Sequence, residues 1–293
     1  MQFHNPGADV FVPDGLELSA ALARTTHLCL AAHQDDIEIM AYHGIAECFG
    51  RSDRWFTGVV LTSGAGSPRS GIYAGYSDEQ MQQVRRQEQR KAATIGEYGC
   101  QVQLGFASAQ VKDPRDHAVV HDLQEILRAA RPEIVYLHNL ADKHDTHVAA
   151  ALRSIAALRA VRDRPKKVYG CEVWRDLDWL PDERKQALPV SERGNLAASL
   201  VGVFDSQISG GKRYDLATAG RRLANATFLA SHSTDRETAL TFAMDLTPLV
   251  EDANLDVAGY ARAFIDRFRE DVEQRITDLQ EKVKNQRAKV KSD

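Results

Sequence analysis

The stretch HLCLAAHQDDIEIM, His27–Met40, decides the fold, because an apolar run ends in it and a polar cluster follows at once. Its first residues are almost continuously apolar, as expected for a strand that is covered on both faces. A segment of helical period begins at Ile37. Between the two lie an imidazole and two adjacent carboxylates, those of His33, Asp35 and Asp36. A simple turn would not require these side chains.

Short apolar runs and segments of helical period continue to alternate further along the chain. Five strands are expected, at His27–Ala32, Phe56–Thr62, Val102–Phe106, Ile134–Leu137 and Val168–Val173. Helices are expected between them, at Ile37–Phe49, Ser77–Tyr98, Ala118–Ala130 and His147–Val161. Such alternation is typical of an α/β fold with a mostly parallel sheet and helices on both faces. We therefore predict a Rossmann-like open sheet with strand order 3-2-1-4-5.

The alternation weakens after about residue 176. We expect a loop-rich insertion near 177–212, a helix over Tyr214–Phe228 and a long helix over Val257–Val290. The apolar residues of the long helix recur every three or four positions, which places them on one face. The chain is thus expected to divide into a Rossmann-like domain, 1–235, and a helical C-terminal extension, 236–293.

The apolar face of the long C-terminal helix has two interpretations. Up to Phe268 it fits a helix that is docked on its own domain. Beyond Phe268 the highly charged tail favours a helix that projects or pairs with another copy of the chain. A homo-oligomer formed through this helix is therefore one expectation.

The composition excludes several classes of protein. The chain has 293 residues, of which 27% are charged, and a net charge of −4, so it lacks the basic excess of a nucleic-acid-binding protein. No apolar segment is long enough to span a membrane, and the N-terminus does not resemble a signal peptide. The four cysteines form no CxxC motif, which fits a reducing, cytoplasmic location. They are Cys29, Cys48, Cys100 and Cys171.

A second polar cluster, HDTH at residues 144–147, follows the fourth expected strand. In the strand order 3-2-1-4-5 it would face the cluster at residues 33–36 across the crevice where open α/β sheets bind ligands. One cluster alone would be weak evidence, because Asp at such a place is often an N-cap. Together they offer two histidines and a carboxylate, a common ligand set for catalytic zinc with one position left for water. A second carboxylate could take the proton of that water, and the remaining histidine could protonate a leaving amine.

These motifs resemble those of a known family. The segment AHQDDIE at residues 32–38 is similar to the AHPDDxE signature of the LmbE-like, GlcNAc-phosphatidylinositol de-N-acetylase-like (PIG-L) family, and HDTH is similar to its later HPDH segment. Arg85 and Glu88 resemble its RxxE helix, and Ser206 with Gln207 resembles a further element. The resemblance extends over residues 26–232.

The resemblance implies a zinc-dependent hydrolase that removes an acetyl group from an N-acetylated amino-sugar conjugate by means of a metal-bound water. It implies His33, Asp36 and His147 as metal ligands. The same donors would bind Fe²⁺ or another divalent transition metal similarly. It further implies Asp35 as general base and His144 as general acid or oxyanion stabiliser. Arg85 is implied as a substrate contact.

The sequence departs from the family pattern at two positions. Gln34 stands in place of a proline, so the turn there is less rigid. Thr146 stands in place of an aspartate that would orient the neighbouring histidine. Either Asp145 or Asp142 is expected to orient His144 instead.

Three further features bear on the substrate. The glycine-rich segment SGAGS, 63–67, lacks the full dinucleotide fingerprint, and SGGKRY, 209–214, is no P-loop, so no nucleotide cofactor is expected. Tyr73 and Tyr76 follow the glycine-rich segment and are predicted to stack on a sugar. An amidase for a larger acyl-amide and a non-catalytic sugar-binding α/β domain stay open as alternative functions.

Overall fold

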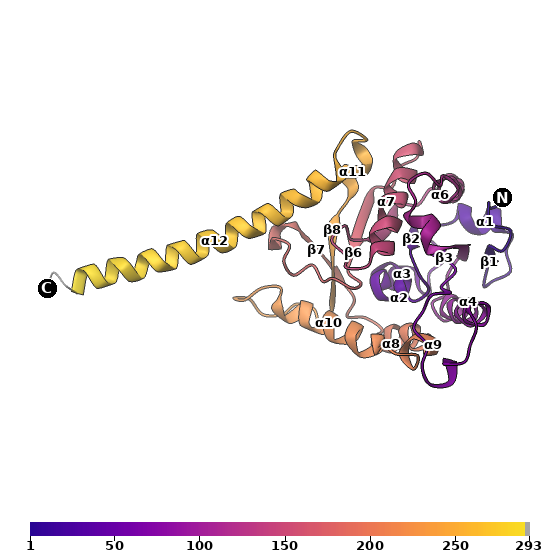
Figure 1. Cartoon of the computed structure of the whole chain (residues 1–293), viewed down its shortest axis with the longest axis horizontal. Coiled ribbons are helices and arrows are strands. Elements are labelled where there is room, and N and C mark those ends of the chain that lie inside the picture. Colours follow the sequence, from indigo (N-terminus) through magenta and orange to yellow (C-terminus); the bar gives the residue numbers. More distant parts are fainter. Residues whose placement is uncertain (291–293) are drawn as a thin grey trace.

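The computed structural model, which describes residues 1–290 and the side chains up to Lys284, contains a single eight-stranded sheet. The strands lie in the order β1-β4-β3-β2-β5-β6-β8-β7 (Figure 1). The five central strands are parallel: β4 (Cys100–Phe106), β3 (Phe56–Thr62), β2 (His27–Ala31), β5 (Ile134–His138) and β6 (Lys167–Cys171). They have the predicted order 3-2-1-4-5, so the Rossmann-like α/β class is confirmed.

Three antiparallel strands that were not predicted extend this sheet at both edges: β1 (Asp9–Phe11), β8 (Leu240–Asp245) and β7 (Lys185–Pro189). β7 lies in the segment expected to be a loop-rich insertion with some helix, and β8 is a strand in the segment that was expected to be helical. β1 is too short to show a period, and β7 is a half-exposed edge strand that ends in proline. The apolar run of β8 does not by itself distinguish a strand from a helix. The division of the chain at residue 235 stays a prediction.

Helices cover both faces of the sheet and bury one apolar cluster on each side. One face carries α1 (Leu18–Ala23), α5 (Ser108–Lys112), α6 (Ala118–Ala130), α7 (Asp145–Ala160) and α11 (Thr247–Glu251). The other carries α2 (Asp36–Met40), α3 (Tyr42–Cys48), α4 (Asp78–Ile95) and α8 (Gly194–Gly202). α9 (Asp205–Ile208) and α10 (Tyr214–Phe228) pack beside α4 and α8. The predicted helix at 37–49 is thus two helices, because the backbone leaves the helical conformation at Ala41.

The last helix, α12 (Val257–Val290), is docked only at its beginning. Val257, Tyr260 and Phe264 pack against the core cluster, whereas Phe268 is already 42% exposed. Beyond that point the helix projects away from the sheet (Figure 1). In the described part of the chain, no helix combines the length and apolar character needed to cross a bilayer. All four cysteines are buried and unpaired, and the cytoplasmic location stays a prediction.

His27, at the start of β2, gives a prediction for the pH dependence of folding. Its ring is 4% exposed and stacks on Tyr136, and burial lowers its pKa to about 4. The folded state therefore keeps His27 neutral at a pH where the unfolded chain binds a proton, so stability is lost as pH falls from the ordinary value of 6.5 towards 4. We expect His27→Gln to reduce the loss of unfolding free energy between pH 7 and pH 5 by about 2 kcal/mol, measured by urea denaturation.

The matched control for this variant is His232→Gln, because His232 is exposed. The control should keep the pH dependence of the wild type. An unchanged pH dependence in His27→Gln would contradict the proposed burial effect.

Candidate metal and catalytic site

The first polar cluster forms a tight turn between β2 and α2. The His33 backbone N–H donates to Asp36 Oδ2 at 2.7 Å, which closes the turn. Asp35 occupies its centre with φ of 87° and ψ of −32°, a conformation that an L-residue adopts only at an energetic cost. The Asp35 backbone N–H donates to Gln89 Oε1 of α4 at 3.4 Å, which helps to hold this geometry. The strain thus falls on Asp35, the first of the two adjacent aspartates.

Three side chains from the two clusters converge on one point. His33 Nδ1 lies 3.2 Å from His147 Nε2, and both nitrogens lie 3.4 Å from Asp36 Oδ2. In a tetrahedral site with metal–ligand bonds of about 2.1 Å, ligand atoms are about 3.4 Å apart. The triangle formed by these three atoms therefore fits a zinc-type cation without rearrangement, and it is the ligand set that the family resemblance implies.

The ionisation of these ligands favours metal binding. Burial alone would raise the pKa of Asp36, but the adjacent His147 and His138 hold it well below its ordinary value. Burial lowers the pKa of His147 to about 4 and also lowers the pKa of His33. At neutral pH the site therefore presents one carboxylate and two neutral imidazoles, which are the forms that bind a metal.

Asp142 supports the ligand His147 from behind. Asp142 Oδ1 lies 3.5 Å from His147 Nδ1 and accepts the His144 backbone N–H at 2.9 Å, while Oδ2 accepts the Trp174 backbone N–H at 3.1 Å. A carboxylate at the distal nitrogen of a ligating histidine fixes the orientation of its ring. His138 stacks on the other side of the ring, with 4.0 Å between the ring centroids.

The ring of His144 is held by neither of the two aspartates that were expected to orient it. Its Nδ1 accepts the Thr146 backbone N–H at 3.3 Å, as the N-cap of α7. Asp145 is exposed, and Asp142 contacts only the backbone of His144. Acceptance at Nδ1 places the proton of the neutral ring on Nε2. Thr146, at the position of the missing family aspartate, thus orients His144 through its main chain.

Asp35 lies in a buried ion pair with Arg85. Arg85 Nη2 is 3.7 Å from Asp35 Oδ1 and also donates to the backbone carbonyl of Gln34 at 2.6 Å, while Nη1 donates to Ser67 Oγ at 2.6 Å. Burial raises the pKa of Asp35 well above its ordinary value, although Arg85 opposes the shift. Arg85 lines the cavity, but most of its donors already bind the protein.

The turn that lacks the family proline is held by side chains instead. Gln34 is buried, and its amide donates to Gln103 Oε1 at 3.1 Å and to the Thr62 carbonyl at 3.3 Å. Gly64 lies against it with a φ of 73°, and a Cβ at this position would come within 2.4 Å of Gln34 Oε1. The glycine-rich segment therefore allows close packing on Gln34 beside the site.

The two weaker sequence elements also meet beside the site. The backbone N–H of Ser206 donates to Glu88 Oε1 at 2.8 Å, and its hydroxyl donates to Oε2 at 2.6 Å. Both residues are buried, and the contact fixes α9 on α4. Gln207, the next residue, consequently lines the cavity.

All five predicted metal and catalytic residues line one cavity of about 370 Å³: His33, Asp35, Asp36, His144 and His147. Tyr73 and Tyr76 are not among the described residues that line it. Tyr73 is buried and donates to Asp205 Oδ2 at 2.6 Å. The aromatic side chains at the cavity are instead Trp174 and Tyr214. Neither belongs to a motif, and the sequence carried no signal that brings them to the site.

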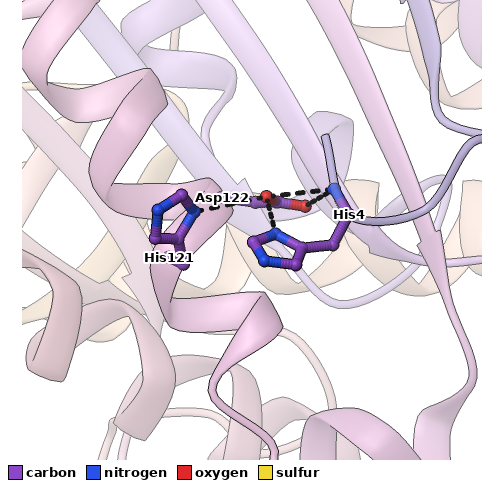
Figure 2. Close-up of side chains that lie close together, drawn as sticks. All are labelled: His4, His121 and Asp122. Atoms are coloured by element: carbon purple, nitrogen blue, oxygen red, sulfur yellow. Dashed lines mark hydrogen bonds and ion pairs between the residues drawn. The ribbon is translucent and has the colours of Figure 1, made fainter. Parts of the chain in front are cut away.

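A second group of potential ligands lies elsewhere, on α6 and the N-terminal segment (Figure 2). Asp122 is fully buried and accepts His4 Nδ1 at 2.6 Å and the His4 backbone N–H at 3.1 Å. His121 Nδ1 lies 3.8 Å from the same carboxylate. These hydrogen bonds explain the buried side chain of Asp122 as a clamp for the N-terminal segment, and none of the three residues lines the cavity.

Comparison with known proteins supports this site at the level of family and fold. Residues 28–158 match the family model PIG-L, described as GlcNAc-PI de-N-acetylase. No curated protein sequence matches the chain. Similar solved structures include the conserved protein TT1542 from Thermus thermophilus, which is 19% identical with a TM-score of 0.59 and covers 75% of this chain and 94% of its own.

Two further structures have the same fold and different named activities. The N,N'-diacetylchitobiose deacetylase from Pyrococcus horikoshii is 14% identical, with a TM-score of 0.57, and covers 78% of this chain and 88% of its own. The 4-carboxy-2-hydroxymuconate hydratase GalB from Pseudomonas putida KT2440 is 18% identical, with a TM-score of 0.59. The match covers 75% of this chain and 95% of the hydratase. At such identities the likeness concerns the fold, and function has to be argued from the site. The segment that matches the GlcNAc-PI de-N-acetylase (PIG-L) family model, residues 28–158, is the one that carries both polar clusters.

Proposed function

We propose that the protein is a metal-dependent N-deacetylase that hydrolyses the acetamide of an N-acetylated sugar conjugate. The observation that carries this proposal is the triangle of His33, Asp36 and His147, which opens on the same cavity as Asp35 and His144. The family name and the fold shared with a chitobiose deacetylase support the same reaction.

The roles of the residues follow from their positions. A divalent cation held by His33, Asp36 and His147 would lower the pKa of water and polarise the acetamide carbonyl. Asp35 takes a proton from the attacking water, which its raised pKa favours, and then passes that proton to the departing amine. His144 uses the proton on Nε2 in a hydrogen bond that stabilises the developing oxyanion. The new C–O bond thus replaces the C–N bond, and acetate and a free amine leave.

The substrate's sugar is proposed to stack on Trp174 and Tyr214, whose rings lie at 89° to one another with centroids 6.0 Å apart. Lys212 Nζ lies 5.3 Å from the Trp174 ring, which fixes one wall of the cavity. Tyr73 acts indirectly, because its hydrogen bond to Asp205 holds the helix that presents Gln207.

This assignment gives a prediction that separates it from stacking by Tyr73 and Tyr76. Trp174→Ala is expected to raise KM about fivefold, because stacking on an aromatic face contributes about 1 kcal/mol. Tyr76→Ala serves as the matched control and should leave KM unchanged. The opposite pattern in steady-state kinetics, with only Tyr76→Ala impaired, would support the alternative assignment of the sugar subsite.

The proposed function is tested by measuring acetate released from a panel of N-acetylglucosaminyl conjugates by the metal-loaded protein. Equimolar acetate and amine from at least one member are expected. Stoichiometric metal with binding but no hydrolysis across the panel would favour the non-catalytic sugar-binding domain.

An amidase for larger acyl groups stays a second candidate, because another cavity of about 180 Å³ adjoins the first and shares Ile39, Val173 and Tyr214 with it. A series of N-acyl sugars with longer chains separates the two functions. For a deacetylase, kcat/KM should fall steeply when the acyl group is longer than acetyl. For an amidase of larger acyl groups, kcat/KM should rise with acyl length.

A further inference from the structure

The projecting part of α12 carries an apolar stripe that nothing covers in the described chain. Phe268, Val272, Ile276, Leu279 and Val283 are between 38% and 57% exposed. The helix extends about 33 Å beyond Phe268 at 1.5 Å per residue. Isolated helices are marginally stable in water, and most helical stability in proteins comes from packing of an apolar face. We therefore expect another apolar surface to pack against this stripe.

The spacing of the stripe specifies a helical partner. Val272, Ile276, Leu279 and Val283 are separated by four, three and four positions, which is the alternation of d and a positions in a heptad repeat. Residues with this spacing form the seam of a coiled coil, in which each side chain packs into a hole on the facing helix.

We propose that this seam pairs antiparallel with the same seam of a second copy of the chain. When Ile276 is set opposite Leu279 of the second copy, Val272 falls opposite Val283, and the same pairs recur across a two-fold axis. The four residues are thus complementary to themselves, as a two-fold interface requires. The interface is independent of the catalytic site and of the function proposed for it.

The charges of the helix favour the antiparallel arrangement. Residues 270–281 contain five acidic residues and one basic residue, whereas residues 282–291 contain five basic residues and no acidic one. In a parallel pair Lys282 and Lys284 of one copy would face the same lysines of the other copy. In the antiparallel pair they lie beside residues 270–273 of the other copy.

The segment that faces these lysines contains acidic residues. Asp266 and Asp271 are already paired within the helix, with Arg269 and Arg275. Among the residues whose side chains are described, Glu270 and Glu273 have no ion pair, so they can meet lysines of the second copy. Such pairs across a coiled coil set the orientation of its helices.

The pairing would hold two α/β units at opposite ends of a rod. The two-fold axis lies between residues 277 and 278, about 20 Å along the helix from Phe264, where docking on the core ends. The two units are then separated by about 40 Å, so each cavity stays open.

The first test is the molar mass of the full chain at about 20 µM, measured by light scattering after size exclusion. A dimer is expected. Ile276→Asp with Leu279→Asp should weaken dimerisation at least 100-fold, because it places four charges in the seam of the pair. The matched control, Gln274→Asp with Thr277→Asp, adds the same charge on exposed positions outside the seam and should remain dimeric. Both variants should keep the thermal transition of the α/β unit.

The orientation is tested by crosslinking, which is selective because the native cysteines are all buried. Val272→Cys and Val283→Cys variants, carrying different tags, are mixed and treated with a short thiol crosslinker. Antiparallel pairing predicts a product that contains one copy of each. Products formed only within each variant would indicate parallel helices and overturn the arrangement. A monomeric wild-type chain would overturn the pairing itself. The apolar stripe would then have to bind a different protein.

Discussion

Asp35→Asn is expected to lower kcat for deacetylation by about 10³-fold while the protein keeps its full complement of metal. Asparagine has the same shape as aspartate and can still contact Arg85, but it cannot accept the proton of the attacking water. Metal content should be unchanged because the three ligand atoms belong to His33, Asp36 and His147. The measurement combines steady-state kinetics with metal analysis of the same preparation.

The matched control is Asp145→Asn, which makes the same chemical change at an exposed position in the first turn of α7. It should retain activity within about twofold. A fully active Asp35→Asn variant would remove Asp35 as the general base. Loss of metal from this variant would show instead that Asp35 is a ligand.

The second large effect is expected at the metal. His147→Ala removes one of the three ligand atoms, so the variant should lose stoichiometric metal and, with it, activity. Asp142→Asn keeps the ligand but weakens the group that orients it, and we expect metal affinity to fall about 10- to 100-fold. The metal affinities of the two variants are compared by measuring metal content after dialysis and then by competition with a chelator.

His121→Ala is the control for this experiment, because His121 belongs to the second group of potential ligands on α6 (Figure 2). Its metal content should equal that of the wild type. Stoichiometric metal in His147→Ala together with loss of metal in His121→Ala would move the metal to the N-terminal clamp and refute the ligand set.

The sequence was sufficient to predict the centre of the fold and the meeting of the two polar clusters, because both follow from periodicity. Continuous apolar runs such as those at β2 and β3 indicate strands that are buried on both faces, and the helices between them require parallel pairing. Parallel neighbours end at the same edge of a sheet, so the polar residues after β2 and β5 had to meet there.

The remaining parts depend on contacts that leave no local pattern. Trp174 follows β6 and Tyr214 begins α10, and only the tertiary fold brings both to the cavity. The main-chain amide of Thr146 orients His144, and a backbone donor cannot be recognised from the identity of a side chain. For α12, the spacing predicted the apolar face, but the point at which docking ends depends on the shape of the core.

The most direct test of the proposed reaction is a single turnover in H₂¹⁸O with the metal-loaded protein and an N-acetylated sugar that it hydrolyses. Attack of water on the acetamide carbon predicts one ¹⁸O atom in the released acetate and none in the amino sugar, as measured by mass spectrometry. Unlabelled acetate, or label in the sugar, would contradict hydrolysis at the acetamide and with it the function proposed for this site.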